Sequence, residues 1–124
     1  PAARTRDERR GRGARSDRDG RSPDADADGR PVVHLTFDDG PSPQATARVL
    51  DLLEQYDARA TFFFLGSAVA EHPGLARRVV EAGHGIGNHT WGHRDLRQLR
   101  PKALRREVMR TQRVVRDATG RAPS

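Results

Sequence analysis

Two pairs of polar residues have the types and the spacing that hydrolytic metal chemistry needs. Asp38 and Asp39 follow an apolar run, and His89 and His93 lie 50 and 54 positions after Asp39. Two histidines four residues apart can reach one metal ion, and one carboxylate would complete a three-ligand set with open coordination positions. The second carboxylate would be free to act as a general base toward a water molecule. The pattern therefore predicts a catalytic metal site rather than a structural one.

Each pair has a more ordinary interpretation when it is taken alone. An Asp-Asp-Gly sequence is usually turn chemistry, and two histidines at i and i+4 are more often not a metal site. Their combination at matching ends of two predicted strands is far more specific than either part. The other histidines, His34, His72 and His84, lack such partners, and we interpret them as structural. We interpret Trp91 as packing beside the site or as a substrate-facing wall.

Three strand–helix units are predicted around these residues. Apolar runs at 32–37 and 60–65 indicate buried strands, and the glycine-containing segment 84–88 indicates a weaker one. Each predicted helix begins at a proline: Pro43, with Ser42 as its N-cap, Pro73 and Pro101. This alternation predicts an α/β fold with right-handed βαβ units and a parallel sheet. Because reactive residues of such folds gather at the carboxyl ends of the strands, the aspartates and histidines should meet at one edge.

Each predicted helix has one apolar face. The three faces are Val49, Leu52, Leu53 and Tyr56; then Leu75, Ala76, Val79 and Val80; then Leu104, Val108, Thr111 and Val115. Gly83 and Gly120 follow the second and third faces and are predicted to end those helices. The run Phe62–Phe64 is most simply core.

Composition limits the class of protein. The 124 residues allow one domain, carry a formal net charge of +6 and include no cysteine, so disulfides and thiolate metal sites are excluded. No run of about 18 apolar residues exists, so we expect no transmembrane helix. Residues 1–30 contain nine Arg, six Asp and one Glu, with alanine as their only apolar side chain, which predicts a disordered linker. We expect no specific nucleic-acid binding there, because acidic residues dilute the positive charge and no aromatic residue can stack on bases.

Two motifs resemble those of a known family. The segment Thr36–Pro41, which reads Thr-Phe-Asp-Asp-Gly-Pro, is similar to the first motif of the polysaccharide deacetylases, the NodB-homology family or carbohydrate esterase family 4. The segment His89–His93 is similar to the second motif, in which a histidine, a Ser or Thr and two further residues precede another histidine. The strand around Thr61 between the motifs also fits, and the resemblance covers residues 31–124.

The resemblance implies a fold, a cofactor and residue roles. The fold would be the first three βα units of an irregular (β/α)7 barrel, truncated and preceded by a disordered segment. Asp39, His89 and His93 would hold a divalent metal ion, most often Zn²⁺, and Asp38 would be the catalytic base. Thr90 would support the histidine loop by hydrogen bonding. The reaction would be hydrolysis of N- or O-linked acetyl groups on a polysaccharide such as chitin, peptidoglycan or xylan.

The sequence departs from the family pattern after residue 120. It contains neither the Arg-Pro-Pro-aromatic segment nor the later histidine that protonates the leaving amine. We therefore expect the chain to be the N-terminal portion of a deacetylase, with a partial domain at 31–124, and to be inactive on its own. The substrate class leads us to expect a secreted or cell-envelope location.

Two other functions stay open at this point. A set of two histidines and a carboxylate also suits a non-haem iron oxygenase, although we associate those sites with antiparallel β-barrels. Iron-dependent oxygen consumption would distinguish this function. The chain could instead be a non-catalytic glycan-binding or scaffold segment, which binding to chitin or peptidoglycan without acetate release would favour.

Overall fold

The computed structural model describes residues 26–124, and the chain divides into two units after Val33. The described part of the first unit contains a tight turn, in which Asp26 Oδ1 accepts a hydrogen bond of 2.9 Å from the amide of Arg30. The linker predicted at residues 1–30 lies for the most part outside the described residues.

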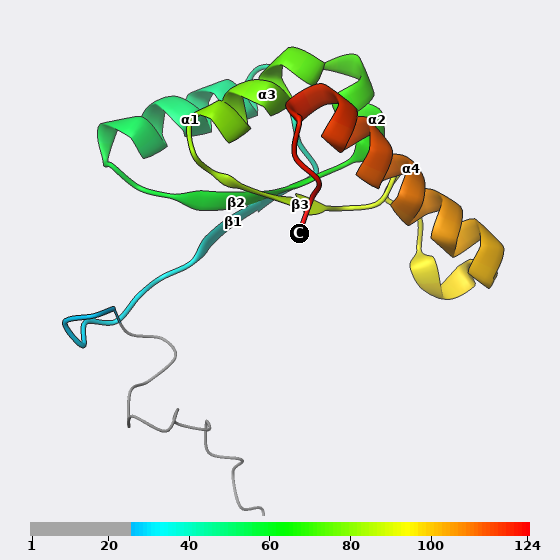
Figure 1. Cartoon of the computed structure of the whole chain (residues 1–124), viewed down its shortest axis with the longest axis horizontal. Helices are drawn as coiled ribbons and strands as arrows, with labels where there is room; N and C mark the ends of the chain where they lie inside the picture. The colour runs from blue at the N-terminus through cyan, green and yellow to red at the C-terminus, as the bar shows by residue number, and fades with distance from the viewer. Residues whose placement is uncertain (1–25) are drawn as a thin grey trace, which may run out of the picture. The chain divides into compact units, whose positions relative to one another are not determined.

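The second unit, His34–Ser124, is built on a parallel sheet with the strand order β1-β2-β3 (Figure 1). Its elements are β1 (Leu35–Asp38), α1 (Ala45–Gln55), β2 (Ala60–Phe64), α2 (Gly66–Glu71), α3 (Pro73–Glu81), β3 (Gly85–Asn88), the 3-10 helix η1 (Leu96–Gln98) and α4 (Pro101–Thr119). Phe62 of β2 aligns with Phe37 on one side and with Ile86 on the other. The predicted α/β class and parallel sheet are confirmed.

Strand β2 is the centre of the sheet and of the core. Ala60, Phe62 and Phe64 are buried, whereas the alternate residues Thr61 and Phe63 are half-buried, as expected for a strand with different cover on its two faces. Figure 1 shows α1 and α3 lying along one face of the sheet. The core joins the buried side of β2 to residues from all four helices: Leu50, Leu53, Val69, Ala76, Val79, Val115 and Ala118.

Strand β1 is shorter and more exposed than the sequence predicts. It begins at Leu35, three residues after the start of the predicted run, and Val33 is 80% exposed. Among the described residues only β2 pairs with β1, and Phe37 is the one side chain of β1 that is half-buried. The prediction of a buried first strand was therefore wrong, because an apolar run is buried only where another element covers it.

Helix α1 begins later than the sequence predicts. Its N-cap is Gln44 rather than Ser42, and the helix starts at Ala45. Ser42 still contributes to the first turn, because its Oγ accepts a hydrogen bond of 3.4 Å from the amide of Ala45. Its own amide donates to Thr46 Oγ1 at 2.9 Å.

The face that helix α1 buries overlaps the predicted one only in Leu53 and the half-buried Val49. The buried residues are Thr46, Leu50 and Leu53, whereas Leu52 and Tyr56 are exposed. Both sets have helical spacing, and the polar Thr46 concealed the correct one. The two exposed residues line an open apolar cavity of about 390 Å³ beside β1, so their exposure follows from the uncovered edge of that strand.

Helix α2 was not predicted from the sequence. It has six residues, which is too short for a periodic apolar pattern, and His72 separates it from Pro73 at the start of α3. At its first residue, Gly66, a Cβ atom would lie 2.6 Å from Thr111 Oγ1 of α4 and 2.6 Å from the ring of Trp91. The absence of a side chain at Gly66 therefore allows α2 to approach α4 closely.

The other predicted elements agree with the structure, whereas the short helix η1 was not predicted. Helices α3 and α4 begin at the predicted prolines, and Gly83 (φ 83°) and Gly120 (φ 73°) adopt left-handed conformations after their ends. The predicted faces of α3 and α4 are buried or half-buried throughout. In β3, Gly87 lies so close to the Phe63 ring that a side chain would clash. No helix among residues 26–124 is both long and apolar enough to cross a membrane.

Candidate metal centre

Backbone hydrogen bonds hold the carboxyl ends of the three strands together. The amide of Leu65, after β2, donates to the carbonyl of Gly40, after β1, at 3.0 Å. The amide of His89, after β3, donates to the carbonyl of Phe64 at 2.9 Å. These bonds continue the parallel pairing beyond the strands and place Asp39 and His89 at the same edge of the sheet.

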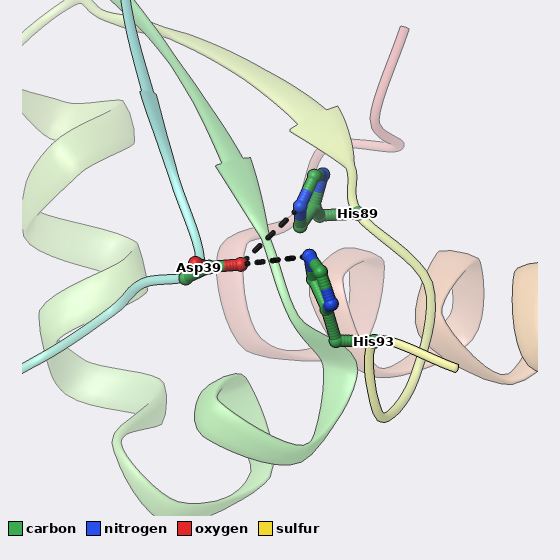
Figure 2. Close-up of side chains that lie close together, drawn as sticks. All are labelled: Asp39, His89 and His93. Carbon is green, nitrogen blue, oxygen red and sulfur yellow. Dashed lines mark ion pairs between the residues drawn. The ribbon is translucent and has the colours of Figure 1, made fainter. Parts of the chain in front are cut away.

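Asp39, His89 and His93 converge at this edge, with both imidazoles directed toward the carboxylate (Figure 2). Asp39 Oδ1 lies 3.2 Å from Nε2 of His89 and 3.5 Å from Nε2 of His93. One donor atom from each residue lies within 4.8 Å of the other two. The two imidazole rings are 4.9 Å apart between centroids. Residues separated by 50 positions in the sequence thus form one cluster.

The geometry of these donors fits a divalent metal ion. In a tetrahedral site with metal–ligand bonds of about 2.0–2.1 Å, neighbouring ligand atoms lie about 3.3–3.4 Å apart. The two distances from Asp39 Oδ1, 3.2 and 3.5 Å, bracket that separation. The Asp39 and His93 side chains are exposed, so solvent and substrate can reach the donors. Three protein ligands also leave a coordination position open, as catalytic zinc sites require.

Left-handed backbone conformations shape the site. Asp39 (φ 70°), Thr90 (φ 69°) and His93 (φ 55°) all lie in this sparsely populated region, where a β-branched residue such as threonine is rare. Two hydrogen bonds hold Thr90 there. Its amide donates to Asn88 Oδ1 at 2.9 Å, and its Oγ1 accepts from the amide of His93 at 3.2 Å. The turn that they stabilise brings His93 back toward Asp39.

Helix α2 holds one side of the loop that carries the histidines. The amides of Gly66 and Ser67 donate to the carbonyls of Thr90 and Trp91 at 2.9 and 3.1 Å. These amides belong to the first turn of α2, where backbone donors have no partner within the helix. The loop carbonyls thus provide acceptors for the free amides at the N-terminus of α2, and these hydrogen bonds fix the loop.

Helix α4 holds the other side of the loop through a buried carboxylate that the sequence analysis did not identify. Glu107 Oε2 accepts hydrogen bonds of 3.2 Å from the amides of both Trp91 and Gly92. In an arginine-rich helix, a glutamate resembles a surface residue. The available signal was its position, three residues after Leu104 and four before Thr111, on the face predicted to be apolar.

Trp91 packs between two helices. The guanidinium carbon of Arg110 lies 3.4 Å from the centroid of the ring, in a cation–π contact. Gly66 of α2 also lies beside the ring. These contacts account for the half-buried position of Trp91, and its role as a substrate-facing residue stays a prediction.

Asp38 lies beside the cluster with a free carboxylate. It is the last residue of β1 and is exposed. Within residues 26–124, no hydrogen bond or ion pair engages its side chain. The carboxylate is therefore able to accept a proton from a bound reactant.

An open cavity borders the two histidines. Its volume is about 440 Å³, within the range typical of small-ligand sites, about 300–1,000 Å³. Its walls are formed by Asn88, His89, Thr90, His93, Arg94, Asp95 and Leu96. Two of the three predicted ligands, His89 and His93, therefore line a space of the size of a small-ligand site.

The other histidines lie outside the cluster. His84 is buried at the opposite end of β3, with its ring centroid 5.5 Å from that of Phe62. Burial, and to a smaller extent the charge of Arg59, lowers the pKa of His84. His34 and His72 are not part of the cluster either.

Comparison with known proteins identifies relatives of this chain. A family model described as polysaccharide deacetylase matches residues 25–124. The peptidoglycan-N-acetylglucosamine deacetylase PgdA of Listeria monocytogenes is 44% identical over 92 residues, which cover 74% of this chain and 20% of the relative. The chitooligosaccharide deacetylase of Bradyrhizobium sp. is 47% identical over 90 residues, which cover 73% of this chain and 41% of the relative.

A solved structure shares the fold. The family 4 acetyl xylan esterase from Clostridium thermocellum, in complex with a cobalt ion, matches with a TM-score of 0.70 and 40% identity, over 73% of this chain and 44% of that one. This chain thus spans less than half the length of each of these three relatives. Because the family model covers every strand and all three clustered residues, the two sequence motifs were a correct guide: the chain belongs to the polysaccharide deacetylase family.

Proposed function

We propose that this chain supplies the metal ligands and the general base of an active site that removes acetyl groups from a polysaccharide. The observation that carries the proposal is the convergence of Asp39, His89 and His93, whose donor atoms lie within 4.8 Å of one another. Asp38, with its free carboxylate, immediately precedes Asp39 in the chain. Membership of the polysaccharide deacetylase family makes deacetylation the chemistry that this arrangement serves.

The four residues have different roles in the proposed reaction. A divalent ion held by Asp39, His89 and His93 would lower the pKa of a water molecule and polarise the acetyl carbonyl. Asp38 accepts the proton of the attacking water, for which its exposed carboxylate has no competing partner among the described residues. The left-handed conformation of Asp39 turns the chain directly after Asp38, so neighbouring carboxylates can serve different partners. Hydrolysis yields acetate and a free amine or hydroxyl group.

We propose zinc as the resident metal. Two imidazole nitrogens and one carboxylate oxygen are donors that zinc uses in catalytic sites. The cobalt ion in the Clostridium thermocellum relative is consistent with a divalent transition metal in this family. Thr90 supports the ligands through its hydrogen bond to the amide of His93.

The substrate is an acetylated polysaccharide with N- or O-linked acetyl groups, such as chitin, peptidoglycan or xylan. This range follows the names of the relatives, which act on peptidoglycan, chitooligosaccharide and xylan. Because polymers of this kind lie outside the cytoplasm, we propose a secreted or cell-envelope location. A non-haem iron oxygenase is not favoured, because the sheet is parallel and the chain belongs to a hydrolase family.

The proposal is tested by acetate release. A polypeptide that contains this chain and matches the length of the Bradyrhizobium relative is incubated with zinc and with acetylated chitooligosaccharide, peptidoglycan or acetylxylan. We expect zinc-dependent release from at least one polymer. His93→Ala should abolish release, whereas His72→Ala, a half-buried histidine outside the cluster, should preserve it. Glycan binding without acetate release would contradict the proposal and indicate a non-catalytic binding function.

A further inference from the structure

We propose that Glu107 of α4 is a positioning residue of the metal centre, which holds the loop between His89 and His93 in the conformation that brings both imidazoles to Asp39. The inference rests on the proposed function, because it assumes that this cluster binds a metal ion. It assigns a role to a residue that contributes no ligand atom and lies 14 positions after His93.

The contacts of Glu107 fall on the segment that separates the two histidines. Its Oε2 atom accepts from the amides of Trp91 and Gly92, each at 3.2 Å. These amides lie between the two imidazole-bearing residues, so their position decides how far apart His89 and His93 stand. One carboxylate oxygen with two donors from consecutive residues fixes both the position and the orientation of the loop backbone.

Within residues 26–124, the Glu107 carboxylate accepts hydrogen bonds from the two loop amides and forms no ion pair. The residue is 9% exposed, and no arginine or lysine in residues 26–124 forms an ion pair with it. The nearby Arg110 stacks on Trp91 instead. Burying a carboxylate without a cationic partner is costly. The presence of this buried carboxylate beside the metal-binding groups is explained if its negative charge strengthens the hydrogen bonds to the loop amides. The same charge would attract the metal cation.

The helix that carries Glu107 is a suitable anchor. Thr111 and Val115, one and two turns further along α4, are fully buried, and Thr111 Oγ1 donates to the carbonyl of Glu107 at 3.0 Å. Rigid elements position a site more accurately than loops do. Because Glu107 is fixed on this packed helix, its hydrogen bonds also fix the loop, which contains two left-handed residues, Thr90 and His93.

The first test compares zinc affinity in the full chain, measured by titration against a competing chelator. Glu107→Gln keeps the size and an acceptor oxygen but removes the charge, and we expect it to weaken zinc binding by roughly tenfold, since loss of a group that orients metal ligands costs about 10–100-fold. Exchange of the Trp91 and Gly92 amides with solvent in the metal-free chain should become faster. Val79→Ala, which removes core packing from α3 at an equally buried valine outside the site, is the control and should keep zinc affinity within twofold.

A second pair of variants tests the same contact from the loop side. Gly92→Pro removes one of the two amide donors, whereas Gly92→Ala retains it, and a Cβ atom at this position meets no atom within 4 Å. We expect the proline variant to bind zinc at least about fivefold more weakly than the alanine variant, because it loses one of two charge-assisted hydrogen bonds.

The outcomes separate the inference from the proposed function. Equal zinc affinity in Glu107→Gln and the unsubstituted chain overturns the inference alone, as does an equal loss in Val79→Ala. If Glu107→Gln does not fold, equal affinity in the two Gly92 variants overturns it. If the unsubstituted chain binds no zinc, the proposed metal site itself fails and the positioning role fails with it.

Discussion

At the scale of single residues, Asp38 and Asp39 have the same side chain in different surroundings. Asp39 has a left-handed backbone and directs its carboxylate toward two imidazoles, at 3.2 and 3.5 Å. Asp38 ends β1 in extended conformation, and its carboxylate has no partner among the described residues. The two side chains therefore differ in backbone conformation and in partners, as the proposed division into metal ligand and base requires.

Substitution of the two aspartates should separate these roles. We expect Asp38→Asn to keep zinc affinity within about threefold, because Asp38 contributes no ligand atom. Asp39→Ala should weaken zinc binding by at least about 100-fold, because it removes a ligand, and loss of outer groups alone costs about 10–100-fold. Calorimetric titration with zinc measures both affinities. Equal losses in the two variants would show that the assignment of ligand and base is wrong.

At the scale of elements, the parallel pairing of the strands and the meeting of both motifs at one edge could be predicted from the sequence. Parallel pairing follows from strand–helix alternation, and it alone brings Asp39 to His89 across 50 positions. The buried faces of α3 and α4 could be predicted as well, whereas the burial of β1 and α1 could not, because it depends on the cover that each element receives. The burial of Glu107 could not be predicted either: its charge suggests solvent, whereas two loop amides retain it in the interior.

The contact between α2 and α4 provides a prediction at this scale. Gly66→Ala would place a methyl group 2.6 Å from Thr111 Oγ1 and from the Trp91 ring. Because α4 and the loop must move to accept it, we expect the free energy of unfolding to fall by about 1–3 kcal/mol, the usual cost of overpacking. Chemical denaturation measures the change.

Gly74 of α3 offers a matched control for this substitution. A Cβ atom there meets nothing within 4 Å, and the residue is not left-handed. Gly74→Ala should therefore leave stability unchanged or raise it by up to about 1 kcal/mol. If Gly66→Ala is as stable as Gly74→Ala, close packing of α2 on α4 does not limit the residue at position 66.

At the scale of the whole molecule, the two ends of the sheet carry histidines in different surroundings. The carboxyl ends of the strands carry the accessible cluster of Asp39, His89 and His93. At the amino end of β3, His84 is 4% exposed and packs on Phe62, and its Nδ1 atom has no hydrogen-bond partner among the described residues. Imidazoles thus serve as accessible donors at one end and as part of the core at the other.

The response of the core to acid can be predicted from His84. Burial, followed by the charge of Arg59, lowers the pKa of His84 below its ordinary value of 6.5. Between that lowered pKa and about pH 6.5, the unfolded chain binds more protons at this residue than the folded chain does, so the free energy of unfolding rises with pH. The contribution of His84 to stability is complete above pH 6.5 and is lost as the pH falls from 6.5 through the lowered pKa.

Denaturation with a metal chelator present, at intervals from pH 8 to pH 5, measures this dependence without interference from bound metal. His84→Leu cannot titrate, so its stability should change less with pH over this interval, whatever its stability at pH 8. Parallel curves for the two proteins would show that His84 does not contribute to acid sensitivity, and that exposed groups elsewhere control it.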